Sequence, residues 1–269
     1  MLYENIIEVN ERIIPHRQDD TLYQNENYHI KTLPNGHQIK VIQQLDLEKL
    51  ENDLKDLYYN KNVKNIAVLL IHSYLYHEHE LEIGRIAKNI GFTNISLSHQ
   101  IGTMIRAVPR GLTTCIDAYL TPCIELYLNS FRASFSSKVN VLFMQSDGGL
   151  TSIDNFRGSR AILSGPAGGV VGYALTSYNR NDKVAVIGFD MGGTSTDVSR
   201  YDGNYEHVFE TLTAGYLIQT PQLVNFFPII SLFLKFSFIY KFIFKGYKYN
   251  SSWWRIYVIF QSWHVLCWT

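Results

Sequence analysis

Residues 187–200 read Ile-Gly-Phe-Asp-Met-Gly-Gly-Thr-Ser-Thr-Asp-Val-Ser-Arg. An apolar run, 184–189, ends at Asp190, two glycines follow, and a hydroxyl-rich segment, 194–199, carries a second carboxylate at Asp197. Paired glycines between two such runs are a turn signal, so the stretch predicts a strand–turn–strand hairpin.

This hairpin has the groups that a phosphate site needs. Glycines let backbone N–H groups approach an anion closely, and neighbouring hydroxyls add further donors. Asp190 is placed to hold Mg²⁺ or to orient a water molecule, and Asp197 is the second candidate catalytic carboxylate. An ordinary hairpin is the alternative interpretation. The candidate nucleotide ligands here are Gly192, Gly193, Thr194, Ser195 and Thr196.

A second glycine cluster, 165–169, precedes an apolar segment that predicts a helix over 170–178. The amino end of a helix presents unpaired N–H groups and the positive end of its dipole. Gly165, Gly168 and Gly169 are therefore further candidate nucleotide contacts. The competing explanation is a helix start with a proline in its first turn. The segment Ser146-Asp-Gly-Gly149 is a weaker candidate, because Asp-Gly is first of all a turn dipeptide.

The rest of the chain up to about residue 225 alternates between strand and helix patterns. Pro34-Asn-Gly36 predicts a hairpin turn. The order that follows, helix–strand–helix–strand, indicates an α/β fold with largely parallel pairing. The expected elements are strands over 28–33, 37–43, 65–72 (buried on both faces), 94–98 and 138–145, and helices over 47–58, 77–90 and 112–135, the last interrupted at Pro122.

Other residues with chemical potential have simpler explanations. His72, His77 and His79 lack a metal-ligand spacing, so we expect solvated or capping side chains. Cys115 and Cys123 are expected to be small buried hydrophobic residues. The pair Arg106 and Arg110 is left open between an ordinary surface pair and a guanidinium fork for a carboxylate.

The composition excludes several classes of protein. The 269 residues contain 24 basic and 24 acidic side chains, so nothing suggests a nucleic-acid surface. Three cysteines are too few and too unevenly spaced for a disulfide framework or a zinc site. The first residues carry no secretion signal, and we expect a cytosolic protein.

The last segment, 226–269, has a different composition. It contains all four tryptophans and five basic residues but no acidic residue. A membrane anchor is disfavoured, because lysines interrupt the apolar run before about 18 residues. We expect this aromatic and basic tail to lie outside the fold.

Five strings of sequence together resemble the hydantoinase/5-oxoprolinase family, and the resemblance runs from about residue 2 to 225. The hairpin string by itself is similar to the second phosphate loop of actin-like ATPases. The five strings are Ile105–Gly111, Cys115–Pro122, Gln145–Leu150, Ser159–Gly172 and Gly188–Arg200.

The resemblance implies an actin-like ATPase (ribonuclease-H-like) α/β fold in incomplete form. Residues 1–111 would be the later part of the N-terminal domain, and 112–225 the start of the domain with the phosphate hairpin. The implied activity is ATP- and Mg²⁺-dependent opening of the lactam 5-oxo-L-proline to L-glutamate, in a homo-oligomer. Asp190 would bind metal and phosphate with Gly192, Gly193 and Thr194, supported by Thr196 and Asp197.

The family pattern also includes an earlier phosphate loop and a long continuation beyond residue 225, which this sequence lacks. We therefore expect an incomplete and inactive copy of the enzyme. The alternatives are an ATP-dependent hydantoinase, a nucleotide-binding chaperone-like module and the product of a non-functional gene fragment.

Overall fold

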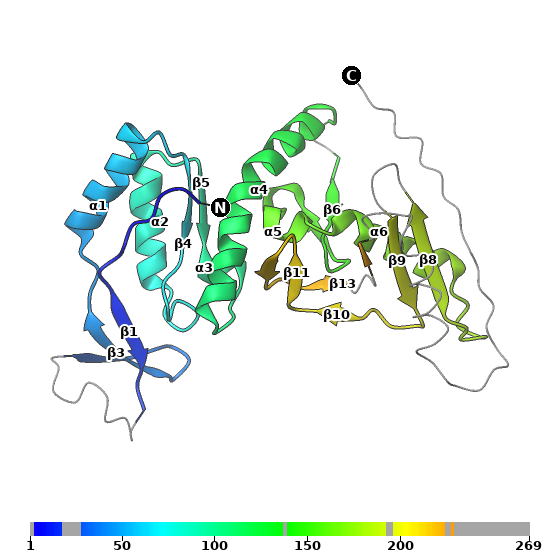
Figure 1. The fold of residues 1–269 in the computed structure, drawn as a ribbon, viewed down its shortest axis with the longest axis horizontal. Helices are drawn as coiled ribbons and strands as arrows, with labels where there is room; N and C mark the ends of the chain where they lie inside the picture. The colour runs from blue at the N-terminus through cyan, green and yellow to red at the C-terminus, as the bar shows by residue number, and fades with distance from the viewer. Residues whose placement is uncertain (1–2, 18–27, 137–138, 192–195, 224–226, 229–269) are drawn as a thin grey trace. The chain divides into compact units, whose positions relative to one another are not determined.

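The computed structural model describes residues 3–17, 28–136, 139–191, 196–223 and 227–228 (Figure 1). They form two compact units. The first takes in the described residues of 3–139 together with 157–159 and 210–220, and the second takes in the described residues of 140–156, 160–209 and 221–228. Helices and strands are mixed in both units, which confirms the coarser prediction of a mixed α and β fold. Among the described strand pairs only 65–68 with 94–97 is parallel, so the prediction of largely parallel pairing is wrong for the rest of the described strands.

The first unit begins with a small antiparallel sheet in the order β1–β3–β2. Its strands are β1 (Arg12–Pro15), β2 (His29–Thr32) and β3 (Gln38–Gln43). The predicted turn joins β2 to β3, and Gly36 adopts a φ of 82°, a left-handed conformation that favours glycine. Four apolar side chains form the core of this sheet: Ile13, Leu33, Ile39 and Val41.

A layered α/β body follows. Strands β4 (Asn65–Val68) and β5 (Asn94–Leu97) pair in parallel, with α2 (Glu78–Ile90) on one face and α4 (Ala107–Ala133) on the other (Figure 1). Helix α1 (Leu47–Lys55) continues into a π-helical turn, η1 (Asp56–Asn60). The core joins α1, α2 and the sheet through Leu50, Leu54, Leu57, Val68, Leu70, Ile83, Ala87, Phe92 and Leu97.

The expected strand over 65–72 is shorter than predicted. It ends at Val68, and Leu69 and Ile71 are 40% and 51% exposed, so it is not buried on both faces. The chain turns after Val68, because the backbone groups of Leu70 bond to buried polar side chains instead of to a neighbouring strand. The N–H of Leu70 donates to the Glu80 carboxylate at 2.9 Å, and its carbonyl accepts from Arg110 at 2.7 Å.

Helix α4 passes through Pro122 without interruption, so the predicted break is wrong. Proline has no N–H, which would leave the carbonyl of Ala118 without its helical donor. The side-chain amide of Asn94, on β5, donates to that carbonyl at 3.2 Å. A residue of the sheet therefore replaces the bond that the proline removes.

The remaining elements of the first unit are the short helix α3 (Ser98–Ile101) and the hairpin of β11 (Thr211–Thr213) with β12 (Tyr216–Ile218). Thr113 of α4 ties this hairpin to the helix, because its hydroxyl accepts from the N–H of Gln219 at 2.8 Å. A short helix, α5 (Gly158–Ala161), lies further along the chain.

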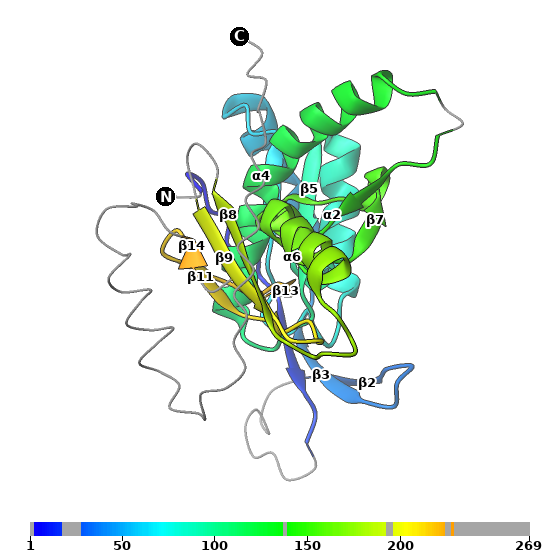
Figure 2. The same ribbon diagram turned by 90° about the vertical axis from the view of Figure 1, so that its right-hand side faces the viewer.

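The second unit contains helix α6 (Ser164–Ser177) beside a ribbon of two long strands, β8 (Val186–Met191) and β9 (Thr196–Tyr201) (Figure 2). The predicted hairpin strands are thus present. Shorter elements complete the unit: β6 (Leu142–Met144), β7 (Leu150–Ser152), the 3₁₀ turn η2 (Ile153–Asn155), β10 (His207–Val208), β13 (Gln222–Leu223) and β14 (Phe227–Pro228).

Two boundaries in this unit differ from the prediction. The strand expected over 138–145 is confined to 142–144, and the helix expected from residue 170 begins at Ser164. The glycine cluster therefore lies inside the helix rather than ahead of it. Of the tail, only Phe227–Pro228 is described, as β14 paired with β9. Within the described ranges, no helix is long and apolar enough to cross a bilayer.

Candidate nucleotide and metal site

Asp190 and Asp197 lie directly opposite each other on β8 and β9. The ladder is continuous from the pair Val186–Tyr201 to the pair Met191–Thr196. Opposed residues of an antiparallel pair point to the same face, with Cβ atoms about 4.5–5.5 Å apart. The fold therefore brings the two predicted carboxylates together.

The two carboxylates differ in environment. Asp190 is exposed and Asp197 is partly buried. Burial, and then the charge of Asp190, raise the pKa of Asp197 above its ordinary value. A divalent cation between the two would offset both effects, and carboxylate oxygens are the ligands that Mg²⁺ uses in proteins. The pair therefore fits a magnesium ion.

Tyr173 of α6 covers the pair Gly188 and Ser199, two residues further along each strand. Its hydroxyl donates to Ser199 Oγ at 3.0 Å, and a Cβ on Gly188 would lie 2.2 Å from its Cε1 atom. Residues two apart on a strand share a face. Asp190 and Asp197 therefore point to the side of the ribbon that α6 covers.

The helix runs with its amino end toward the two carboxylates. Tyr178, just after α6, donates to the carbonyl of Asp202 at 3.1 Å and meets the ring of Tyr201, so this end lies beside the end of β9. Tyr173 lies beside the middle of the ribbon. Going back four residues along the helix covers about 6 Å, close to two strand residues. From these dimensions we infer that Gly169 is nearer than Tyr173 to the carboxylate pair along the ribbon.

The glycine cluster faces open space at this point. Gly169 lies four residues before Tyr173 and so on the same side of the helix. No described atom lies within 4 Å of a Cβ built on Gly165 or Gly169, and Met144 lies 3.9 Å from one built on Gly168. A ligand held by the carboxylates would meet helix backbone here, with no side chain between them.

The position of each glycine within α6 determines whether its N–H group is available to a ligand. In an α-helix the first N–H groups have no partner within the helix, whereas later ones bond four residues back. Gly165 is in the first turn, and Gly168 and Gly169 are one turn further on. Gly165 thus offers its N–H at the helix end. Gly192, Gly193, Thr194 and Ser195 lie outside the described residues, and Thr196 is the first residue of β9.

Tyr173 was not singled out from the sequence. The available signal was Gly188, because glycine inside a strand marks the close approach of another group. That signal does not identify the approaching residue, which lies on a different element.

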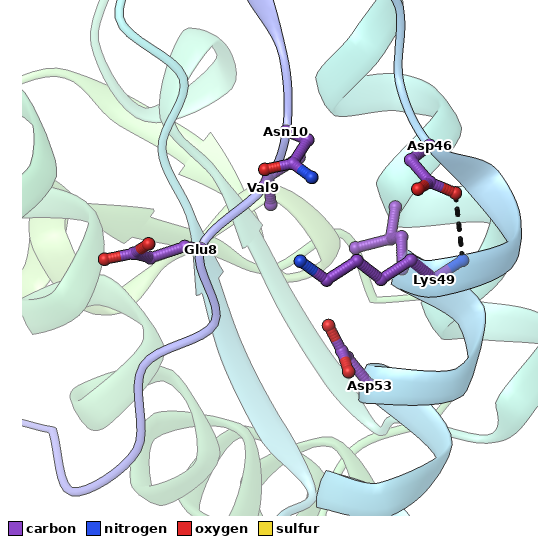
Figure 3. Close-up of a pocket in the computed structure, with 7 residues that line it drawn as sticks. Glu8, Val9, Asn10, Asp46, Lys49 and Asp53 are labelled. Atoms are coloured by element: carbon purple, nitrogen blue, oxygen red, sulfur yellow. Dashed lines mark hydrogen bonds between the residues drawn. The ribbon is translucent and has the colours of Figure 1, made fainter.

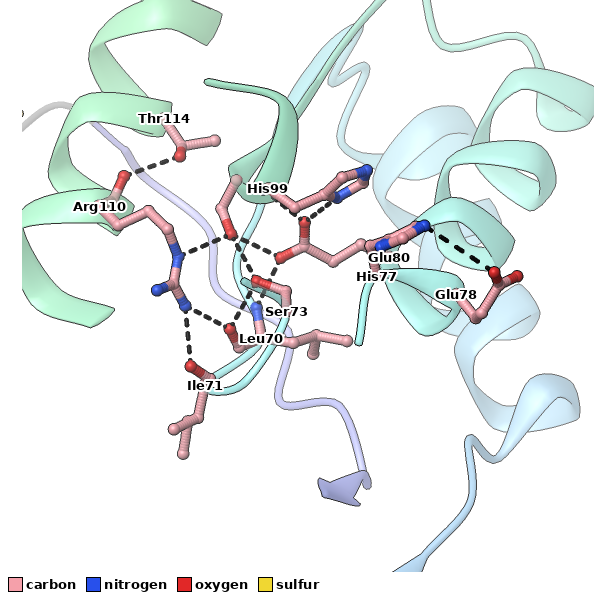
Figure 4. A network of polar contacts seen from close by, with 10 residues as sticks. Leu70, Ile71, Ser73, His77, Glu78, Glu80, His99, Arg110 and Thr114 are labelled. Carbon is pink, nitrogen blue, oxygen red and sulfur yellow. Dashed lines mark hydrogen bonds and ion pairs between the residues drawn. The ribbon is translucent and has the colours of Figure 1, made fainter. Parts of the chain in front are cut away.

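Sequence reasoning also missed a buried polar network in the first unit (Figure 4). The fully buried Glu80 accepts from Ser98 Oγ at 2.7 Å and from His99 through both its N–H (3.0 Å) and Nδ1 (2.7 Å). Arg110 is 1% exposed and donates to Ser98 Oγ at 3.1 Å. The open question about Arg110 is thereby answered, because it is a buried structural residue.

Arg106 pairs with Glu210 at the surface, so the two arginines do not form one fork. The histidine prediction was wrong for His79, which is buried and contacts Glu11 at 3.0 Å and Gln44 at 3.2 Å. His77 is exposed, as predicted. Over the part of the chain that the structure describes, no three potential ligands cluster as a metal site.

The two cysteines on α4 are less buried than predicted. Cys123 is exposed, and Cys115 is partly buried. Burial raises the pKa of the Cys115 thiol. The prediction of two buried hydrophobic residues was therefore wrong for Cys123.

The hollows of the first unit offer no better candidate site. One, between the N-terminal segment and α1, is lined by Glu8, Asn10, Lys49 and Asp53 and encloses about 10 Å³ (Figure 3). That volume holds one water molecule at most. A wider opening of about 400 Å³ lies between residues 7–13 and 69–71, and its lining combines six apolar residues with Glu8, Asn10, Glu11 and Arg12.

Comparison with known proteins places the chain in a family. Residues 110–225 match the hydantoinase/oxoprolinase model, and residues 1–91 match the hydantoinase/oxoprolinase N-terminal region. A 5-oxoprolinase of Dictyostelium discoideum is 49% identical over 242 residues, a match that covers 83% of this chain and 19% of the relative. The chain thus spans about a fifth of that protein's length.

Two solved structures share the fold at 22% identity. A nucleotide-free acetone carboxylase aligns with a TM-score of 0.61, covering 78% of this chain and 31% of its own. The ATP-dependent caprolactamase of Pseudomonas jessenii aligns with a TM-score of 0.57, covering 78% and 33%. With two family models matched over most of residues 1–225, the chain belongs to the hydantoinase/oxoprolinase family.

Proposed function

We propose that this chain binds MgATP between the β8–β9 hairpin and the start of α6, for the ATP-dependent opening of 5-oxo-L-proline to L-glutamate. One observation carries the proposal. Asp190 and Asp197 are opposed on β8 and β9, and the glycine-rich start of α6, the helix packed on this ribbon, has space for added atoms at Gly165 and Gly169. The name of the Dictyostelium relative supplies the lactam, and the caprolactamase supplies a second case of ATP used on a cyclic amide.

Each residue has a definite role in this proposal. Asp190 holds the metal, and Asp197 completes the carboxylate pair. Gly192 and Gly193 with Thr194, Ser195 and Thr196 surround the phosphates, and Gly165, Gly168 and Gly169 form the opposite wall. Gly165 offers an N–H and the positive end of the α6 dipole, whereas the other two glycines contribute a bare surface.

The reaction explains why nucleotide is needed. A five-membered lactam is a poor electrophile, and its opening is uphill without coupling to ATP. Transfer of the γ-phosphoryl group to the amide oxygen makes the attached carbon electrophilic, and water adds at that carbon. The C–N bond then breaks as the ring nitrogen takes a proton, and a second water hydrolyses the resulting acyl phosphate to L-glutamate and phosphate. Bound magnesium would supply charge neutralisation on the phosphates. The protein residues place the γ-phosphate in line with the lactam oxygen.

The finer architecture is part of the same proposal. We assign the unit with α6 and the β8–β9 ribbon to the actin-like ATPase class. We keep residues 1–111 and 112–225 as the two family regions, although α4 runs across residue 111. Residues 226–269 are assigned to neither, and a cytosolic homo-oligomer is the expected setting.

We expect nucleotide binding without turnover. The described residues supply one carboxylate hairpin and no group placed to activate water, and misplacement of reactants alone costs orders of magnitude in rate. A hydantoinase would use the same site on a different cyclic amide. A chaperone-like module or an inert fragment would not respond to added lactam, because neither would bind one.

The test is Mg²⁺-dependent binding and hydrolysis of ATP by the purified chain, with and without 5-oxo-L-proline, beside an Asp190→Ala variant. Binding that requires Mg²⁺ and is lost in the variant supports the site. Unchanged binding in the variant would disprove it. Hydrolysis stimulated by the lactam would show that the chain is active by itself, against our expectation, and stimulation by a hydantoin instead would favour the alternative substrate.

A further inference from the structure

Ser146 is fully buried and connects three segments of the second unit. Its N–H and its hydroxyl both donate to the carbonyl of Arg160, at 2.8 and 2.7 Å. The same hydroxyl oxygen accepts from the N–H of Leu163 at 2.9 Å. Its carbonyl accepts from the N–H of Leu223, on β13, at 2.8 Å. Both polar groups of its backbone and its side chain are thus satisfied.

These partners lie at the point where α6 begins. Leu163 is the N-cap residue of α6, and its carbonyl accepts the first helical bond, from Ala167 at 2.9 Å. The Ser146 hydroxyl therefore fixes the peptide that joins Ile162 to Leu163, the residue immediately before the first helical residue, Ser164. The cap itself makes no side-chain hydrogen bond, so this contact comes from another segment of the chain.

The rest of the turn Ser146–Gly149 supports the same helix. Gly148 has a φ of 79°, and a Cβ there would lie 2.9 Å from Leu223 and 3.3 Å from Val171 of α6. Asp147 accepts from the N–H of Gly149 at 2.9 Å and lies 3.6 Å from the guanidinium of Arg160. Gly148 thus packs closely against the helix, and Asp147 is held by contacts within the turn and with Arg160.

We propose that Ser146 is a positioning residue that sets where the first turn of α6 stands relative to the carboxylate pair. This inference rests on the proposed nucleotide site. The hydroxyl holds Leu163 at one end of the helix, and Tyr173 holds the β8–β9 ribbon further along it. Between the two, the N–H of Gly165 is kept in place for a phosphate. The Ser-Asp-Gly-Gly segment thus acts on the ligand only through α6.

The physical basis is the sensitivity of anion binding to position. Backbone N–H groups bind phosphate only at hydrogen-bond distance, about 2.7–3.2 Å. Ser146→Ala leaves the N–H of Leu163 without an acceptor, and the helix start must shift or open to water to satisfy it. A displacement near 1 Å can lower the efficiency of a positioned site by up to about a hundredfold.

The experiment compares MgADP and non-hydrolysable MgATP affinity, by isothermal titration calorimetry, in the whole chain and in three variants. Ser146→Ala is the test, and Asp190→Ala reports on the site itself. Ser73→Ala is the matched control, because Ser73 is 1% exposed and donates to a backbone carbonyl at 3.0 Å in the first unit. Thermal unfolding without nucleotide is recorded for each.

We expect about ten- to a hundredfold weaker binding in Ser146→Ala and unchanged binding in Ser73→Ala, although both lose unfolding temperature. A purely structural serine would instead lower only the unfolding temperature, as in the control. If Ser146→Ala does not fold, Asp147→Asn, which removes the ion pair with Arg160 at a partly exposed position, is measured in its place. Weaker binding in that variant is again expected.

Failure of the two proposals can be told apart. If Asp190→Ala loses binding but Ser146→Ala, or Asp147→Asn in its place, binds like the wild type, the inference about Ser146 is wrong and the site stands. If the wild type binds no nucleotide, or Asp190→Ala binds normally, the proposed site is wrong and the role of Ser146 is overturned with it.

Discussion

The ring of Tyr173 occupies the volume that a side chain on Gly188 would need, with its Cε1 and Cδ1 atoms 2.2 and 2.5 Å from the position of such a Cβ. The contact lies two residue pairs away from Asp190 and Asp197, on the same face of the ribbon. The distance between α6 and the two carboxylates therefore depends on residue 188 having no side chain.

Replacement of Gly188 by alanine should push Tyr173 away and destabilise the fold by about 1–3 kcal/mol, the usual cost of overpacking. Gly172→Ala is the matched control, since Gly172 is exposed on α6 with no described atom within 4 Å of a new Cβ. That change should stabilise the helix by about 0.5–1 kcal/mol. Urea unfolding of both variants measures the difference, and an equal response would contradict the contact.

The paired carboxylates predict an unusual pH response at Asp197. Its pKa in the folded chain is raised above the ordinary 3.8, first by burial and then by Asp190. The folded state therefore holds this proton more tightly than the unfolded state, and stability falls as the pH rises from about 3.8 through the raised value. Asp197→Asn should raise the unfolding temperature at pH 7 and have almost no effect near pH 3.

With Mg²⁺ present at pH 7, the wild type should have a higher unfolding temperature than Asp197→Asn, the reverse of the order expected without the metal. The wild type should gain stability from Mg²⁺ at pH 7, because a cation offsets the two facing charges, whereas Asp197→Asn should gain less. Asp182→Asn is the control, an exposed carboxylate that accepts from Asn179 at 2.8 Å. Identical pH profiles for wild type and Asp197→Asn would show that the two carboxylates do not interact.

The buried Glu80 predicts a large loss of stability. Glu80→Gln would turn an amide N–H₂ toward groups that donate, and would remove the carboxylate that pairs with His99 Nδ1 at 2.7 Å. Breaking a buried pair of this kind costs about 3–5 kcal/mol. Glu82→Gln breaks an exposed pair with Arg85 on the same helix and should cost under about 1 kcal/mol. Equal losses in guanidinium unfolding would rule out the buried network.

The proline in α4 allows a double-mutant test. Asn94→Ala should cost about 1–3 kcal/mol, because the carbonyl of Ala118 is left without a donor. In a Pro122→Ala background, residue 122 regains an N–H that can serve the same carbonyl, and the loss should shrink. The coupling is read from the free energies of unfolding of the four chains. The same loss in both backgrounds would show that the Asn94 amide does not replace the helical bond.

What the sequence predicted well depends on neighbouring residues. The turn at Gly36 and the end of α2 at Gly91, which has a φ of 116°, follow from glycine's access to the left-handed region. The opposition of Asp190 and Asp197 follows from hairpin register once the two strands are assigned. For these features the information lies within a few residues.

What the sequence did not predict depends on partners far along the chain. Helix α4 continues because Asn94, 24 residues before Ala118, supplies a donor. Arg110 is buried because its acceptors include the carbonyls of Leu70 and Ile71. The strand at 65–68 ends early because Glu80 takes the N–H of Leu70. No periodicity within a segment reports such contacts, which form only when the elements pack.

The bond between Asn94 and Ala118 also has a consequence for the order of folding. An isolated α4 would lack one hydrogen bond at its centre, so the helix should form incompletely until β5 is in place. Docking of β5 and completion of α4 should then occur in a single cooperative step, because the Asn94 amide reaches the Ala118 carbonyl only when both elements are in place. Residues on either side of Pro122 should therefore exchange their amide hydrogens at a common rate, set by the opening of β5 rather than by fraying of the helix.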